Sequence, residues 1–135
     1  MQITRQADYA VRAILYLAQA GNNGSNGRVA TSSVAKEQNI PSSFLAKIIA
    51  QLSIAGLLDT LRGAHGGVKL ARKPSDITLL QVVEAIGGPI QLNVCVGGQG
   101  TCPFEPNCSV RLVWCDAQNE MVTKLKNTNF AQLIA

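Results

Sequence analysis

Three of the four cysteines lie in one short stretch, CVGGQGTCPFEPNC, which runs from Cys95 through Cys102 to Cys108. Closely spaced thiols can form disulfides, bind zinc, hold an iron–sulfur cluster or act as redox switches. Their spacing is C-x6-C-x5-C, without the C-x2-C pair that usually draws the ligands of a small zinc site together. A cluster tolerates a longer loop, because its irons are spread farther apart than the ligands of one zinc ion. The spacing therefore favours iron–sulfur chemistry, with zinc or another metal and bare redox thiols as alternatives.

Two further features of this region bear on the ligand set. Gly97, Gly98 and Gly100 let backbone N–H groups approach the sulfur atoms of a cluster, which tunes its potential. Cys115, the fourth cysteine, follows Cys108 by seven residues, or about 10 Å along a helix. That separation is unfavourable for sharing a small cluster, so Cys115 is interpreted as a small apolar thiol rather than a ligand.

The rest of the chain indicates a reducing compartment for these thiols. The N-terminal stretch has an apolar run that Asp8 and Arg12 interrupt, and it lacks the charged region and cleavage site of a signal peptide. No stretch approaches the ~18 to 20 uninterrupted apolar residues of a membrane span. We therefore expect a cytoplasmic protein with no membrane partner, and a reducing cytoplasm argues against structural disulfides.

Charge divides the 135-residue chain into two unequal parts. Residues 1–75 carry nine Lys or Arg and three Asp or Glu, whereas residues 76–135 carry three and five. A basic part joined to a slightly acidic part predicts a polyanion-binding domain at 1–75 and a regulatory or assembly extension at 76–135. Because only 4% of the residues are aromatic, a base-stacking surface for single strands is not expected.

Hydrophobic periodicity predicts three helices in the first of these parts. The first helix begins at Thr4, its N-cap, and ends before the polar loop GNNGSNG. The second is short and is capped by Thr31 or Ser32. The third follows a turn at Asn39 and ends at Gly56, with its apolar residues on one face.

Beyond the third helix, apolar and polar residues alternate around a glycine-rich tip, which predicts a β-hairpin. Helix, short helix, turn, helix and basic hairpin is the order of a winged helix-turn-helix domain, which binds DNA. Its last helix enters the major groove with an outward N-terminal face, and its wing must be thin and positive to lie along the minor groove. The residues predicted to contact DNA are Ser42, Ser43, Phe44 and Lys47 on the helix, and Arg62, Gly63, His65 and Gly66 on the wing.

The second part of the chain is predicted to contain two helices, one on each side of the cysteine loop. The first is capped by Ser75 or Asp76, and the second runs from Cys108 to about Lys126. A long amphipathic helix on one small domain usually needs a partner to cover it, and a twofold homodimer suits a palindromic double-stranded DNA operator. The predicted fold is mainly α with a small β-wing, namely a winged helix-turn-helix domain plus a long dimerisation helix.

Five segments of the chain, taken in order, are together specific for one family. They are MQITRQADYAVRAILYLA, NIPSSFLAKIIAQLSIAGLL, LRGAHGGVKLAR, ITLLQVVEAI and the three-cysteine loop. Over essentially its whole length, the chain resembles the Rrf-type bacterial transcription regulators, which include IscR-like and NsrR-like members. The resemblance implies a homodimer in the bacterial cytoplasm, in which the long helix of each subunit crosses its partner. It also implies that Cys95, Cys102 and Cys108 hold a [4Fe-4S] or [2Fe-2S] iron–sulfur cluster near the dimer interface.

The fourth ligand of such a cluster differs between the branches of this family. In IscR-like members it is a histidine three residues after the last cysteine, but here that residue is Arg111, which cannot ligate. In NsrR-like members a carboxylate near the N-terminus of the other subunit fills the place, and Asp8 in RQADYAV matches it. An oxygen ligand binds iron more weakly than a thiolate and is readily displaced, which suits a sensor. The alternative interpretation of Asp8 is an acid that the dipole of the first helix favours.

Two departures from the family pattern have consequences. The loop has one residue more between Cys95 and Cys102 than we expect of NsrR-like members, which leaves the type of cluster open. Ala46 stands where IscR-like members have a glutamate that reads a cytosine amino group, so a different operator sequence is expected.

The residues and the resemblance together predict a dimeric DNA-binding repressor that senses nitric oxide, redox state or iron–sulfur status through a cluster. The alternative is a winged-helix regulator with a structural zinc ion or a cluster-free thiol redox switch. An enzyme or a thiol redox carrier is not expected, because no nucleophile–base pair, phosphate-binding loop or carboxylate pair accompanies the thiols.

Overall fold

A computed structural model of the chain describes residues 3–22, 27–63, 66–97, 102–104 and 107–135. Its helices and strands follow in the order α1 (Arg5–Asn22), α2 (Thr31–Glu37), α3 (Ser42–Ile54), β1 (Leu58–Leu61), β2 (Gly67–Leu70), α4 (Leu79–Gly87), α5 (Ser109–Lys126) and α6 (Phe130–Ile134). Two 3-10 turns, η1 (Pro74–Asp76) and η2 (Val94–Gly97), precede α4 and α5. The predicted fold class, mainly α with a two-stranded antiparallel wing, is confirmed.

The start of α1 and the turn between α2 and α3 lie where the sequence predicts them. The Oγ1 atom of Thr4 accepts a hydrogen bond from the N–H of Ala7 at 3.1 Å, so Thr4 acts as the N-cap of α1. Asn39 forms the turn after α2 with a φ of 52°, in the left-handed region that asparagine tolerates better than most residues.

The end of α3 is a Schellman motif. The N–H of Leu57 donates to the carbonyl of Leu52, and the N–H of Gly56 donates to the carbonyl of Ser53. Gly56 has a φ of 78°, which a glycine adopts without steric cost. The prediction that Gly56 ends this helix is therefore confirmed.

The predicted N-cap of α2 is wrong. Thr31 and Ser32 lie inside the helix, and Ala30 occupies the cap position without a side-chain hydrogen bond. The reason lies in the preceding residue, because Val29 forms an antiparallel bridge with Val68 of the wing. The extended stretch that this bridge fixes ends at Ala30, so the helix starts at Thr31, one residue earlier than a cap at Thr31 would give.

The predicted N-cap of α4 is also wrong. Ser75 and Asp76 lie in η1, and the helix is capped by Thr78 in a reciprocal capping box with Gln81. Ile77 separates the two elements, because it is extended and fully buried. A helix that began before Ile77 would turn this side chain away from the core.

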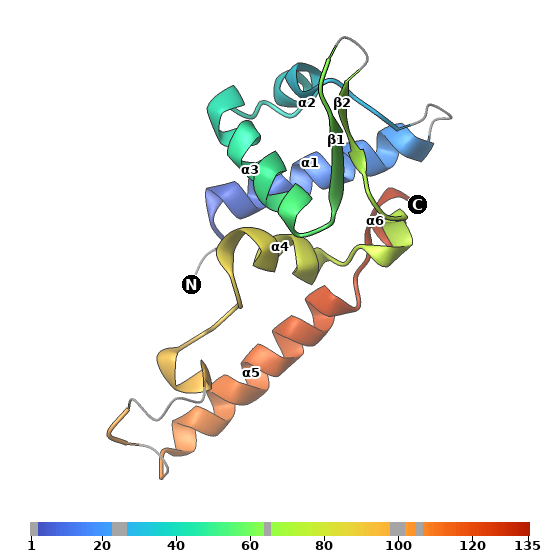
Figure 1. Ribbon diagram of the computed structural model, residues 1–135. Helices are drawn as coiled ribbons and strands as arrows, with labels where there is room; N and C mark the ends of the chain where they lie inside the picture. The colour runs from blue at the N-terminus through green and yellow to red at the C-terminus, as the bar shows by residue number, and fades with distance from the viewer. Residues whose placement is uncertain (1–2, 23–26, 64–65, 98–101, 105–106) are drawn as a thin grey trace.

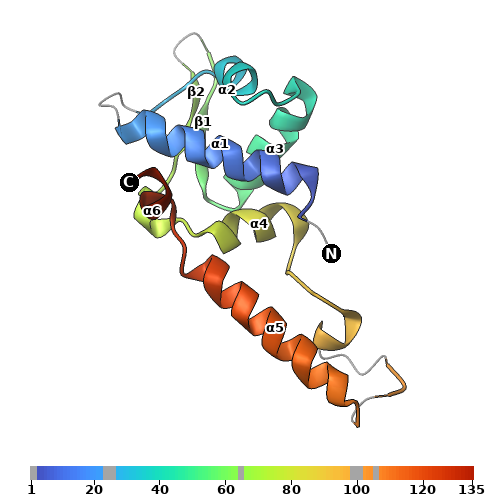
Figure 2. The same cartoon turned by 180° about the vertical axis from the view of Figure 1, so that it is seen from behind.

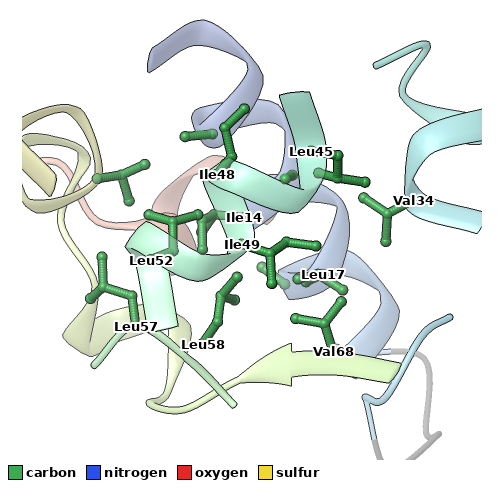
Figure 3. Close-up of a cluster of buried hydrophobic side chains, with 14 of the residues drawn as sticks. Ile14, Leu17, Val34, Leu45, Ile48, Ile49, Leu52, Leu57, Leu58 and Val68 are labelled. Atoms are coloured by element: carbon green, nitrogen blue, oxygen red, sulfur yellow. The ribbon is translucent and has the colours of Figure 1, made fainter. Parts of the chain in front are cut away.

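The core lies where α1, α3 and the wing meet, as Figure 3 shows. Each helix contributes one apolar face, at the spacing that the sequence predicts. The largest fully buried aliphatic side chains are Ile14, Leu17, Val34, Leu45, Ile48, Leu52, Leu57, Val68, Ile77 and Val82. This packing holds α3 and the hairpin against α1.

No helix is predicted after Lys126, yet residues Phe130–Ile134 form α6. Asn129 and Gln132 form a second capping box at its start. Phe130 is fully buried in the core, and its N–H donates to the carbonyl of Ile77. The chain after α5 is thus anchored beside the start of α4.

Helix α5 projects away from the rest of the molecule, with its end near α6 and its start at the far tip (Figure 1). The turn η2 lies beside the first half of α5 in both views (Figures 1 and 2). All eighteen residues of α5 are described, and none of them is buried. The predicted division of the chain between residues 75 and 76 stays a prediction. Two helices of the predicted second part, α4 and α6, pack against α1 of the first part.

Among the described residues, no helix combines the length and the apolar character that a membrane span requires.

Candidate nucleic-acid interface and cysteine site

Helix α3 presents a polar N-terminal surface and buries its opposite face. Ser42, Ser43 and Lys47 are exposed, as the sequence predicts for a helix that enters the major groove. Phe44 is 42% exposed and rests against the ring of Tyr9 on α1, with the ring centroids 6.3 Å apart. Phe44 therefore also holds the start of α3 against α1, a role that the sequence analysis does not include.

The wing is a regular antiparallel hairpin, whose strands pair from Leu58 with Leu70 to Leu61 with Gly67. Arg62 follows β1 directly and is exposed. Gly63 has a φ of 108° and accepts a hydrogen bond from the N–H of Gly66 at 2.9 Å. A side chain at Gly66 would collide with the carbonyl oxygen of Leu61, so the turn itself demands this glycine. His65 lies outside the described residues.

Arg28 fastens the wing to the body of the molecule. Its guanidinium donates to the carbonyl of Gly67 and lies 3.3 Å from the carboxylate of Asp59, on the two strands of the hairpin. The bridge between Val29 and Val68 continues the same attachment. From the sequence, Arg28 is recognised only as part of the basic charge, because contacts across 31 and 39 residues leave no periodic signal.

The four cysteines are free thiols that lie on α5 and in the segments before it. All four are half-buried. Cys108 is the N-cap residue of α5, which confirms the predicted start of the long helix. A hollow of about 260 Å³ adjoins it, lined by Asn107, Cys108, Ser109, Arg111 and Leu112. Cys95 lies in η2, and Cys102 lies in the short described segment 102–104.

The three thiols are not brought together into a metal-binding geometry. Among the described residues, no three His, Cys, Asp or Glu side chains lie close enough to hold a metal ion. Gly98 and Gly100, predicted to approach a cluster, lie outside the described residues, as do other parts of the segments that join the cysteines. The donors suit iron chemically, since three soft thiols and one carboxylate are ligands that iron accepts.

Two side chains of α5 hold the segment that carries Cys95. The side-chain oxygen of Gln118 accepts a hydrogen bond from the N–H of Leu92 at 2.8 Å. The Nε of Arg111 donates to the carbonyl of Cys95 at 3.4 Å, a long hydrogen bond. From the sequence, Arg111 was recognised only as a residue that cannot ligate, and Gln118 was not predicted as a site residue.

Asp8 lies on the first turn of α1, and its side chain is 54% exposed. It borders an open hollow with Ile3, Thr4 and Arg5. This end of α1 lies against α4. The cysteine segment lies instead beside the start of α5, at the tip that is far from α1 (Figures 1 and 2). Within one subunit, Asp8 is therefore not brought to the cysteines.

Arg12 links Asp8 to the helix-turn-helix. Its Nε lies 3.4 Å from the Asp8 carboxylate without hydrogen-bond geometry, and its Nη1 donates to the carbonyl of Gln38 at 2.9 Å. The same guanidinium lies 5.0 Å from the ring centroid of Tyr9, which in turn packs on Phe44. Asp8 is thus two contacts away from the turn before α3 and three contacts away from Phe44 at the start of α3.

Helix α5 carries a group of large apolar side chains that the described part of the subunit leaves largely exposed. The members lie in its first two turns and are 41% to 67% exposed, namely Val110, Leu112, Val113 and Trp114. An apolar group of this kind is typical of a protein–protein interface rather than of a solvated helix.

Comparisons with known proteins indicate one family for the chain and its fold. The family model Rrf2, described as an iron-dependent transcriptional regulator, matches residues 3–135. The chain is 32% identical to protein rrf2 of Nitratidesulfovibrio vulgaris, with 99% of this chain and 87% of the relative covered. It is 28% identical to the HTH-type transcriptional regulator NsrR of Geobacillus kaustophilus, with 99% and 90% covered. The solved structure of T. potens IscR aligns with a TM-score of 0.77 at 25% identity, with 99% and 86% covered.

Proposed function

The chain belongs to the Rrf2 family of transcriptional regulators, and from this premise we propose that it is a homodimeric cytoplasmic repressor whose signal enters through an iron–sulfur cluster. The family consists of DNA-binding regulators and not of enzymes. The relatives named IscR and NsrR support the finer assignment for this chain. The signal class is nitric oxide, redox state or iron–sulfur status.

One observation carries the proposal: the molecule presents two separate incomplete surfaces. Around α3 and the wing, Ser42, Lys47 and Arg62 are exposed on a rigid, basic domain that suits a duplex. On α5, free thiols adjoin large apolar side chains that are left uncovered. The first surface fits a palindromic double-stranded operator, and the second fits another copy of the chain.

The ligand set follows from this dimer. Cys95, Cys102 and Cys108 of one subunit supply thiolates, and Asp8 of the other subunit supplies an oxygen. The exposure of Asp8 and its remoteness from the thiols of its own chain support this assignment. When bound, the cluster would supply iron that reacts with nitric oxide or oxygen, and an oxygen ligand leaves a position that is readily opened.

The contacts of Arg12 provide the connection to DNA binding. A carboxylate that is drawn toward the partner's cysteine loop moves away from Arg12, which also bonds Gln38 and covers Tyr9. Arg12 is then free to shift relative to Gln38 and Tyr9. Whether Asp8 binds the cluster therefore changes how firmly the turn before α3 and the Tyr9 ring beneath Phe44 are held. Because half-sites on DNA are about 34–36 Å apart, a small shift of each α3 is enough to lower operator affinity.

The visible absorption spectrum of protein purified without oxygen tests the proposal directly. A brown protein with sulfur-to-iron charge-transfer bands, whose bands and operator affinity both change on addition of nitric oxide or oxygen, is the expected result. Colourless protein with one zinc ion per chain contradicts the cluster and supports a structural metal.

A cluster-free thiol switch is the second candidate. The observation in its favour is that the described thiols are free and are not gathered into a metal site. In that case the protein is colourless and metal-free, and its operator affinity changes with thiol oxidation. Metal analysis and thiol counts on the same sample distinguish the two candidates.

A further inference from the structure

We propose that Arg111 and Gln118 are positioning residues that clasp the segment from Leu92 to Cys95 along α5, so that Cys95 is held near the start of this helix before any metal binds. The inference rests on the proposed function, because holding Cys95 in place matters only if this cysteine binds a metal centre. It assigns Arg111 a task at the position where IscR-like members have a ligand.

The two clasping residues lie on one face of α5. Arg111 and Gln118 are seven residues apart, which is two helical turns and a rise of about 10 Å. Cys115 lies between them on the same face and is half-buried. A segment that runs over this face accounts for the partial burial of Cys115, and it assigns that thiol to packing rather than to coordination.

The segment has the length that such a clasp requires. Leu92 and Cys95 are three residues apart, so this stretch spans at most about 10 Å. Its N–H at Leu92 is held by Gln118, toward the middle of α5, and its carbonyl at Cys95 is held by Arg111, near the helix start. The chain therefore runs antiparallel to α5 and arrives at the end where Cys108 caps the helix.

Holding this segment lowers the ordering cost of metal binding. Two thiols on an unrestrained loop must lose conformational freedom when they bind one centre. Here two side-chain hydrogen bonds restrict the backbone that carries Cys95 in the metal-free protein. Arg111 also places a positive charge beside the thiols without occupying a coordination position.

Hydrogen exchange of the metal-free protein tests the clasp without any cluster. In Gln118→Met, exchange at the Leu92 N–H should rise roughly 5-fold, the effect of losing one hydrogen bond. Gln118→Glu keeps an acceptor oxygen and should restore slow exchange. Asn119→Leu makes a matched change at the neighbouring exposed residue and should leave Leu92 as it is in the unmodified protein. Equal exchange at Leu92 in Gln118→Met and Asn119→Leu overturns the clasp.

Binding of Co²⁺ to the metal-free protein tests positioning, since the thiolate-to-cobalt absorption band reports the cysteines directly. The double variant Arg111→Met/Gln118→Met should bind Co²⁺ roughly 10-fold more weakly, and Gln118→Glu should bind as the unmodified protein does. Unchanged Co²⁺ affinity in the double variant overturns the positioning role. A protein that shows both effects but never takes up an iron–sulfur cluster keeps the clasp and refutes the proposed function instead.

Discussion

The winged-helix part and the α5 arm differ in how far their apolar side chains are buried within the subunit. Around α1 and α3, side chains such as Ile14 and Leu52 are fully buried within the subunit. On α5, Leu112 is 67% exposed and no residue of the helix is buried. The first part is completed by its own chain, whereas the second leaves large apolar side chains exposed, which a second copy would cover in the proposed dimer. The proposed sensing end and the DNA-binding end would then rest on different kinds of stability.

The largest effect that tests this contrast is expected at Phe130. Phe130→Ala should lower the free energy of unfolding by about 3–5 kcal/mol, because a fully buried ring leaves a cavity. Phe104→Ala is the matched control in the cysteine region, where the ring is 74% exposed, and should change stability by less than about 0.5 kcal/mol. Denaturant titration measures both, and equal losses would show that the arm is self-supporting.

The next effect is on assembly. Leu112→Asp combined with Val113→Asp should weaken the dimer at least about 100-fold, since carboxylates would be buried in an apolar interface. The fold of the subunit should persist, because neither residue contributes to its core. Sedimentation velocity measures the mass, with Leu133→Asp on α6 as the control that should remain dimeric. A double variant that is still a dimer places the interface elsewhere.

The cysteines should separate into two classes. Serine substitution of Cys95, Cys102 or Cys108 should remove most of the bound iron, whereas Cys115→Ser should retain it. The reason is position, since Cys115 lies about 10 Å along α5 from the cap residue Cys108. Iron per chain in anaerobically purified variants measures this, and an iron-free Cys115→Ser protein contradicts the assigned ligand set.

On the DNA side, Arg62 and Lys47 should act differently. Arg62→Ala should cost roughly 1–3 kcal/mol of operator binding if the wing enters a groove. Lys47→Ala should mainly reduce the dependence of log affinity on log salt by about one unit, as loss of a phosphate contact does. Titrations at several salt concentrations measure both, and unchanged affinity in both variants would refute the docking mode.

The smallest effect on stability is expected at Asp8. Its ion pair with Arg12 is an exposed pair within one helix, so Asp8→Ala should change the unfolding free energy of the metal-free protein by less than about 0.5 kcal/mol. The cluster spectrum and its rate of reaction with nitric oxide should nevertheless change. If both match the unmodified protein, Asp8 is only a helix-dipole acid, and the link from cluster to operator fails.

Local signals in the sequence were sufficient for much of the fold. The cap at Thr4, the turn at Asn39, the helix end at Gly56 and the helix start at Cys108 are confirmed, because each depends on residues within a few positions of it. The caps of α2 and α4 were wrong, because a bridge from Val29 to the wing and the burial of a residue between η1 and α4 decide where these helices begin.

By itself, the sequence determined the winged helix-turn-helix order, the basic half and the grouping of three thiols beside a long helix, since periodicity, charge and spacing are local properties. Only the tertiary structure decided that Arg12 joins α1 to the turn before α3 and that Phe44 packs on Tyr9. It also decided that Arg111 and Gln118 hold the chain ahead of the cysteine loop. Such contacts join residues 16 to 35 positions apart, and their partners are selected by packing in three dimensions rather than by any repeating pattern along the chain.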